Sequence, residues 1–503
     1  MAERIRHTVV TCGVHQPHIT PRRPTAGGLR SFILGSIPRR NETPVKAFIR
    51  PEQPAIDVSE IIERQKMSGF LFTLVGVSWI ITFLDGFDTN LVSFAAPYFA
   101  SDYHLSRVQL GNIFAMGLLG TLIGGFLLGY VGDRIGRRPA VILSSAGFGV
   151  LTLCFAFATG YWSLFCLRLI SGIPLGGILP LAWALNMEYV PKRYRSTVVT
   201  VIMMGFSAGT GFGGPIAVWL IPKLGWKAVF VLGGLAALLC AVILFLALPE
   251  SIRFLASQRH EPGRIAAILN RIAPGQSFSP QAAYVLADEP AAKKDFKPSL
   301  LFLGELKKIT PLIWLAYMAS SFAAYFLVNW TPLVLESLKF SRRDAAAAAS
   351  LMSLMGAMGA LCLMRFTDRR GAMAVTVMPV MTFILLLIAG FVNVPHSVFL
   401  VLTAGIGFFL VGGQLGVISL CGIFYPTAYR ANGAGWASGV AKIGSVLGPL
   451  AGGWVLSTNM PVRNIFDVLA ICPAIFAVCI YAVGRMHSRM LGYEALVELE
   501  PTR

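Results

Sequence analysis

Residues 129–138 read Gly-Tyr-Val-Gly-Asp133-Arg134-Ile-Gly136-Arg137-Arg138, and a weaker copy, Asp368-Arg369-Arg370-Gly371, follows at an offset of 235 residues. The same offset places Pro191-x-x-Tyr194-Arg195 on Pro426-x-x-Tyr429-Arg430 without a gap. Matches between glycines alone are common in a glycine-rich chain, so these two charged pairs carry the comparison. They predict an internal repeat that divides the chain into two similar halves. Two repeats in parallel orientation imply alternating access to a central site.

Apolar runs of membrane-spanning length recur on both sides of this loop. The chain of 503 residues is 55% hydrophobic and 13% charged, whereas soluble domains carry about 25% charged residues. Each run is close to the ~20 residues that cross a bilayer core. We therefore expect an all-α polytopic membrane protein with twelve transmembrane helices in two pseudo-symmetric six-helix halves. The expected spans are residues 70–97, 109–130, 139–158, 162–187, 198–221, 227–248, 310–335, 345–366, 372–392, 397–424, 432–457 and 464–485.

Polar segments flank and divide these spans. They predict a disordered cytoplasmic N-terminal tail at 1–66, a first half at 67–248, a cytoplasmic central loop at 249–309, a second half at 310–486 and a cytoplasmic tail at 487–503. Residues 1–66 contain no apolar run long enough for a signal peptide, and part of them is alternatively sequence upstream of the true start.

The formal charge is +18, from 42 Lys and Arg against 24 Asp and Glu. In a membrane protein such an excess follows from basic residues retained on the cytoplasmic side, so no nucleic-acid partner is expected. Basic clusters follow the second, fourth and eighth spans, which places both termini and the central loop in the cytoplasm. Lys339, Arg342 and Arg343, after the seventh span, run against this trend.

Chemistry-bearing motifs are absent from the expected loops. Seven of the eight cysteines lie within apolar runs, where we expect them to be small packing residues, and the eighth is Cys12. No Cys-x-x-Cys, His-Glu-x-x-His, Walker or Gly-x-Ser-x-Gly pattern lies in a loop. The sequence therefore predicts neither an enzyme nor a bound metal or cofactor.

The loop at 129–138 has a physical interpretation beyond topology. Asp133 can face the positive N-terminal end of a neighbouring helix or pair with an arginine, as a latch that breaks when the halves rock. A topology signal made of basic residues would not require Asp133 and Gly136 at fixed places. Glu188, at the end of the fourth span, is expected in a cytoplasmic ion pair. The expected cytoplasmic gate comprises Gly129, Asp133, Arg134, Gly136, Arg137, Arg138, Glu188, Asp368 and Arg369.

Ionisable residues inside spans are costly unless they face a cavity or a partner. Asp85 and Asp88 are three residues apart on one face of the first span, so their carboxylates repel and at least one is expected to carry a proton. The alternative is an outer helix end, but the apolar run continues to Pro97. Arg168, in the fourth span, can pair with either aspartate as a structural clasp or as part of a proton relay.

Lys442 lies about ten residues into the eleventh span, too deep to reach water easily by snorkelling. A fixed cation in a central cavity suits an anionic substrate, and the alternative is a buried ion pair with a carboxylate. Aromatic and amide residues near mid-membrane could complete such a site, although each alone is more often packing. They are Tyr325, Asn329 and Trp330 in the seventh span and Gln414 in the tenth.

Four features together resemble the aromatic acid:proton symporter family of the major facilitator superfamily, over residues 54–485. They are Ile56-Asp-Val-Ser-Glu-Ile-Ile-Glu-Arg-Gln65, Asp85-Gly86-Phe87-Asp88, Arg168 with the glycines that follow it, and the stretch from Tyr425-Pro426 to Gly448. The resemblance implies proton-driven uptake of benzoate-like, hydroxybenzoate-like or phenylpropanoid acids across a bacterial inner membrane.

The resemblance also carries residue roles over to this chain. It assigns the aspartate pair to Asp85 and Asp88, the loop aspartate to Asp133 and the arginine of the fourth span to Arg168. The cation of the eleventh span is commonly arginine in this family, and here it is Lys442, which keeps the charge but loses the bidentate fork. The expected partners are an aromatic carboxylate, protons and the lipid bilayer, and the expected form is a monomer.

Other functions stay open at this stage. One is carriage of another organic anion, and the other is efflux. Antiporters of the superfamily often carry a glycine motif in the fifth span, so the place of this motif bears on efflux. The fifth span here lacks it, and the eleventh has it as Gly435, Gly444, Gly448, Pro449, Gly452 and Gly453. A membrane sensor would need a folded cytoplasmic domain, and neither 1–66 nor 249–309 has the apolar content expected for one.

Overall fold

A computed structural model describes most of the chain from residue 56 onward. The described residues are 56–258, 261–273, 276–286, 298–304, 306–370, 375–392, 395–414, 425, 430–458 and 460–499. Within them, eleven helices are long and apolar enough to cross a membrane, and the shorter apolar helix α12 occupies the place of the predicted ninth span. The chain is thus a multi-pass membrane protein with the predicted all-α architecture.

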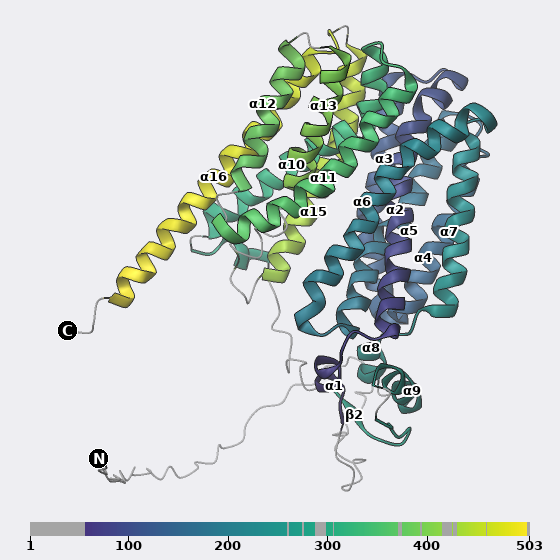
Figure 1. Cartoon of the computed structure of the whole chain (residues 1–503), viewed down its shortest axis with the longest axis vertical. Helices are drawn as coiled ribbons and strands as arrows, with labels where there is room; N and C mark the ends of the chain where they lie inside the picture. The colour runs from purple at the N-terminus through teal and green to yellow at the C-terminus, as the bar shows by residue number, and fades with distance from the viewer. Residues whose placement is uncertain are drawn as a thin grey trace, which may run out of the picture. The chain divides into compact units, whose positions relative to one another are not determined.

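The first half is a bundle of six helices, drawn in purple to teal in Figure 1. The helix ends match features of the sequence. Ser106 and Gln109 form a capping box at the start of α3, and Gly136, with φ of +100°, ends α3 and separates it from α4. The helices are α2 (Gly69–Asp102), α3 (Arg107–Ile135), α4 (Arg137–Phe155), α5 (Tyr161–Tyr189), α6 (Lys192–Leu224) and α7 (Lys227–Ala247).

The second half follows the same plan, in green to yellow in Figure 1. Its elements are α10 (Leu306–Ser337), α11 (Arg342–Arg370), α12 (Val377–Phe391), α13 (His396–Ile406), the π-helical turn η3 (Gly407–Val411), α15 (Arg430–Ser457) and α16 (Asn464–Leu499). α12 begins five residues later than the predicted span at 372. The end of the predicted tenth span, 415–424, lies outside the described residues.

The helix bounds confirm the internal repeat. Adding 235 to the bounds of α3 gives 342 and 370, which are the bounds of α11. The same shift carries the end of α2 onto Ser337, the end of α10, and the start of α5 onto His396, the start of α13. The two halves therefore agree in helix placement as well as in their charged motifs.

Buried side chains form three clusters that show where the halves meet. One cluster joins both halves at the end of the bundle where α2 ends and α3 begins, and we call this the far end. There Phe114 of α3 meets Trp330 of α10 edge to face, with ring centroids 5.3 Å apart. At the opposite end each half has a cluster of its own. Within the described residues, the buried apolar core is thus continuous between the halves only at the far end.

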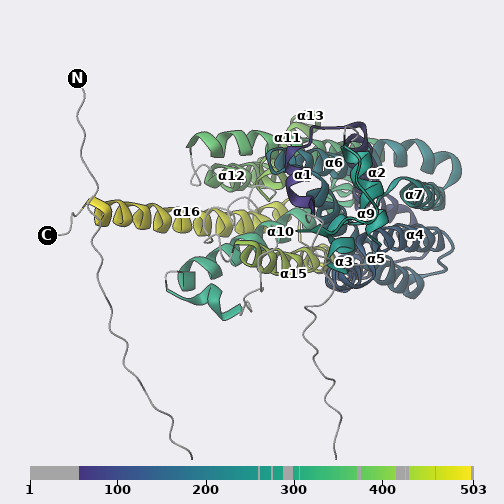
Figure 2. The same cartoon turned by 90° about the horizontal axis from the view of Figure 1, so that it is seen from below.

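A small layer of short helices and strands covers the other end of the first half. It consists of β1 (Ile56–Asp57), α1 (Val58–Arg64), α8 (Ile252–Gln258), α9 (Pro262–Ile272) and β2 (Tyr284–Val285), and we call it the platform. β1 and β2 pair in parallel, with Ile56 opposite Tyr284. Figures 1 and 2 both show α1 and α9 gathered at this end, which we call the platform end.

The platform differs from the expectation of a disordered tail at 1–66, because the last residues of that segment form β1 and α1. Val58 and Ile62 of α1 and Ile265, Leu269 and Ile272 of α9 are buried in the same cluster as the ends of α2, α4 and α5. Either segment alone is too short to bury an apolar face, but together with the helix ends they make a shared core. The end of the central segment belongs with the second half instead. There the 3-10 helix η1 (Pro298–Phe302) packs on α10.

Candidate functional site

Asp88 and Arg168 are brought together by the packing of α2 beside α5. A terminal nitrogen of the guanidinium lies 2.7 Å from Asp88 Oδ2, and the two side chains are 11% and 3% exposed. The arginine fits because Gly117 of α3 faces it: a Cβ at that position would lie 2.5 Å from Arg168 Nε. A buried ion pair of this geometry holds both charges in place.

Asp85 lies one turn before Asp88 on α2 and is buried, with 6% of the residue exposed. Within the described part of the chain, no cationic group lies within ion-pairing distance of it. Its carboxylate nonetheless interacts electrostatically with Lys442, Asp88 and Arg168. The pair of aspartates is therefore unequal, because one carboxylate is neutralised by direct contact and the other is not.

Lys442 comes from α15 in the second half and reaches toward the first half. Its Nζ donates to Thr121 Oγ1 of α3 at 3.5 Å, the outer limit of a hydrogen bond, and its charge interacts with that of Asp85. An ammonium group has three donors, so two remain for a ligand. Thr121 is a residue that sequence reasoning missed, since a single threonine in an apolar span carries no signal of its own.

The other predicted binding residues occupy different settings. Tyr325 of α10 interacts electrostatically with Asp85. Asn329, one turn along the same helix, accepts a hydrogen bond from Ser93 Oγ of α2 at 3.4 Å. Gln414 donates to Ser321 Oγ within the second half at 3.1 Å. Trp330 is fully buried and donates from its indole to Pro449 O at 3.1 Å, so in this conformation its ring is engaged in packing α10 against α15 and α3.

A further polar contact between the halves lies beside this cluster and was not predicted. Asn90 Nδ2 of α2 donates to Ser353 Oγ of α11 at 3.2 Å and to Thr210 O of α6 at 3.0 Å. With Ser93–Asn329 and Lys442–Thr121, it makes a layer of cross-half polar contacts around the two aspartates. In a low-dielectric interior these donors and acceptors are costly to leave unpaired, so any movement of the halves has to provide them with new partners.

The loop between α3 and α4 is organised by a glutamate that the sequence reasoning did not single out. Glu250 Oε1 accepts from the backbone amides of Arg137 at 3.0 Å and Arg138 at 3.2 Å, the first residues of α4. A Cβ at Gly136 would lie 2.6 Å from Glu250 Oε2. The carboxylate that faces a helix N-terminus here is therefore that of Glu250, and Asp133 is exposed.

The other gate residues lie around this contact at the platform end. Glu188 pairs with Arg137 and accepts a hydrogen bond from Ser251 Oγ. Arg138 donates to Phe245 O at 2.6 Å, and Arg134 stacks on the ring of Tyr130. Gly129 has open space where a Cβ would stand. The side chains of Asp368 and Arg369 lie outside the described residues.

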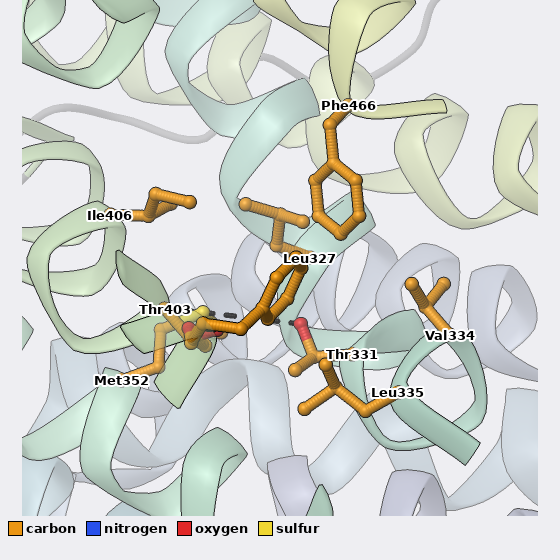
Figure 3. Close-up of a pocket in the computed structure, with 9 residues that line it drawn as sticks. Leu327, Thr331, Val334, Leu335, Met352, Thr403, Ile406 and Phe466 are labelled. Atoms are coloured by element: carbon orange, nitrogen blue, oxygen red, sulfur yellow. Dashed lines mark hydrogen bonds between the residues drawn. The ribbon is translucent and has the colours of Figure 1, made fainter. Parts of the chain in front are cut away.

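A small apolar cavity lies within the second half, away from these charges. Figure 3 shows Leu327, Thr331, Met352, Thr403 and Phe466 around it, with the Thr331 hydroxyl 3.9 Å from Met352 Sδ. No charged side chain lines it. Its lining suits helix packing and does not offer a partner for an anion.

Comparison with known proteins adds to this geometry. Residues 78–449 match the Major Facilitator Superfamily. The chain is 32% identical over 447 residues to a gallate transporter of Pseudomonas putida, covering 89% of this chain and 98% of the relative. It is 32% identical over 436 residues to the 4-hydroxybenzoate transporter PcaK of Acinetobacter baylyi, covering 86% and 94%. The xylose transporter XylE from E. coli shares its fold, with a TM-score of 0.64 at 18% identity over 82% of this chain and 98% of that one.

Proposed function

The chain belongs to the Major Facilitator Superfamily, within its aromatic acid:proton symporter family, and from that membership we propose that it imports an anionic aromatic acid together with protons across a bacterial inner membrane. It is a transporter and not an enzyme. The proposed substrates are benzoate-like, hydroxybenzoate-like or phenylpropanoid acids. The two halves would rock around the layer that holds Asp85, Asp88, Arg168 and Lys442.

The observation that carries the proposal is the unequal pair of aspartates opposite a lysine. Asp88 is neutralised by Arg168, which leaves Asp85 as the buried carboxylate available to take up a proton. An isolated buried carboxylate is far more costly charged than neutral. We therefore assign the proton site to Asp85 and the role of holding the local geometry to the Asp88–Arg168 pair.

Coupling then follows from charge balance. While Asp85 is charged, it competes with the substrate for the ammonium group of Lys442. Once Asp85 is protonated, Lys442 is the cation available to a carboxylate that has left water, and proton and substrate favour each other's binding. Tyr325, Asn329 and Gln414 are proposed to contact the ring and its substituents, while Trp330 acts through packing in this conformation.

The conformation supports the same cycle. With the basic loops and the platform in the cytoplasm, the far end is the periplasmic side, and the shared core there closes the protein to the outside. The separate cores of the two halves at the platform end support the assignment of an inward-facing state. In that state the proposed latch of Asp133 would be released, in keeping with its exposure.

The test is uptake of labelled aromatic acids into membrane vesicles with an imposed pH gradient. Asp85→Asn should abolish accumulation above equilibrium, because the amide fills similar space but cannot carry the proton, whereas counterflow exchange should survive. Asp88→Asn should impair both, because Arg168 loses its partner. Full gradient-driven accumulation by Asp85→Asn would contradict the assignment of the proton site.

A further inference from the structure

Among the basic residues after the seventh span, which are on the side expected to be poor in basic residues, Arg342 contacts both halves of the protein. Arg342 is the first residue of α11, and its guanidinium lies over the ring of Tyr98 of α2, 4.6 Å from the ring centroid. Its Nε is 3.5 Å from the carboxylate of Glu336, near the end of α10. Glu336 and Arg342 belong to the second half and Tyr98 to the first, so the stacked ring is the partner across the interface.

A second arginine at this end belongs to the other half. Arg107, the first residue of α3, interacts electrostatically with Glu336. Positions 107 and 342 differ by 235, the offset of the internal repeat, so the two arginines are pseudo-symmetric counterparts. A small cleft between the halves is lined by Phe94, Tyr98, Pro332, Glu336, Arg342 and Ala346. Glu336 thus pairs with Arg342 of its own half and interacts electrostatically with the matched Arg107 of the other half.

We propose that Tyr98, Arg107, Glu336 and Arg342 form a periplasmic gate that holds the outside of the transporter closed. Glu336 is the positioning residue, because its ion pair directs the Arg342 guanidinium onto Tyr98. Parting the halves at this end must separate Arg342 from Tyr98 and Arg107 from Glu336. The inference rests on the alternating access of the proposed function, and its consequences appear in conformation without any substrate.

The strength of these contacts suits a gate that has to open in every cycle. The side chains of Arg342 and Glu336 are 55% and 23% exposed, so water competes for both. Exposed ion pairs and cation–π contacts are weak, and losing one of them shifts a two-state equilibrium by roughly threefold to fivefold. The gate therefore biases the closed state without locking it.

The experiment measures which side is accessible, with two reporter cysteines in a chain whose native cysteines are replaced by serine. Ser350 of α11 is buried against Gly214 of α6 on the periplasmic side, so Ser350→Cys reacts with an impermeant maleimide outside only when the halves part there. Ser438 is exposed one turn before Lys442 on α15, so Ser438→Cys reports the inward-facing state.

In right-side-out vesicles without substrate, Arg342→Ala and Tyr98→Leu should each speed outside labelling of Ser350→Cys at least threefold. In inside-out vesicles the same changes should slow labelling of Ser438→Cys. The double variant should resemble the single ones, because each single variant already removes the same contact across the interface, that of Arg342 with Tyr98. Arg343→Ala, which removes the same charge from the next residue, is the matched control. Faster labelling of both reporters in Arg342→Ala, or equal effects of Arg342→Ala and Arg343→Ala on Ser350→Cys, would overturn the proposal.

Discussion

At the scale of single residues, Lys442 is the side chain whose surroundings most directly predict an effect on substrate binding. Its hydrogen bond to Thr121 is long, and its ammonium group keeps donors for an incoming carboxylate. Lys442→Gln should weaken binding of an aromatic acid by at least tenfold, since the anion would leave water without a fixed partner. Lys442→Arg should retain binding, given the match of a guanidinium to a carboxylate. Binding measured by counterflow is the readout.

A neutral aromatic analogue provides the control for Lys442. It should bind wild type poorly and lose little more in Lys442→Gln. Unchanged affinity of that variant for the acid would make Lys442 a structural residue, and the anion site would then have to be sought at Arg168.

Gly117 predicts a second effect at this scale. A methyl group there would lie within 2.5 Å of Arg168 Nε and displace the guanidinium from Asp88. Gly117→Ala should therefore lower transport severalfold and change its pH profile toward that of Asp88→Asn. Gly125→Ala on the same helix is the control, because its Cβ would meet only an ordinary contact at 3.4 Å. Equal activity of the two variants would show that the arginine accommodates the methyl group.

At the scale of elements, the start of α4 depends on the carboxylate of Glu250. That group accepts two amide hydrogen bonds at a helix N-terminus, where negative charge is favoured by the helix dipole. Glu250→Gln should lower the free energy of unfolding by about 1 kcal/mol and should reduce the thermal midpoint in detergent. Glu261→Gln, at an exposed pair with Arg264 on the platform, should leave the midpoint unchanged. Equal midpoints for both variants would contradict the capping role.

The platform shows what element-level reasoning from sequence overlooked. α9 has the apolar spacing of an amphipathic helix, with Ile265, Leu269 and Ile272 on one face, but it spans only eleven residues. Its partner, α1, precedes the first span by sequence and lies about 200 residues away from α9. Composition counted over each segment separately cannot show that two short apolar faces will combine with the ends of membrane helices.

At the scale of the whole molecule, the predicted topology of twelve spans with both ends inside places the segment after α7 in the cytoplasm. A reporter fused at Gln276, on the platform, should be active only as a cytoplasmic reporter. A fusion at Arg463, between α15 and α16, should be active only outside. Because the two fusions are expected on opposite sides of the membrane, each is the positive control for a reporter that is inactive in the other. An external Gln276 would reverse the orientation and with it the assignment of the closed side.

The sequence by itself determined the helices, their repeat and the charges within them. Hydrophobic length and the 235-residue offset are local properties of the chain, and buried charges are conspicuous because a bilayer makes them costly. These properties are enough to predict the two halves and to select Asp85, Asp88, Arg168 and Lys442 as candidate site residues.

Only the tertiary structure decided how these charges are shared. Pairing of Arg168 with Asp88, and not with Asp85, depends on the small Gly117 beneath the arginine and on how α2 lies beside α5. The approach of Lys442 to Thr121 and of Arg342 to Tyr98 depends on which face each half turns to the other. The last two contacts join residues more than 240 positions apart. No pattern within one helix specifies any of the three, because a helix fixes its own faces but not the partner that covers them.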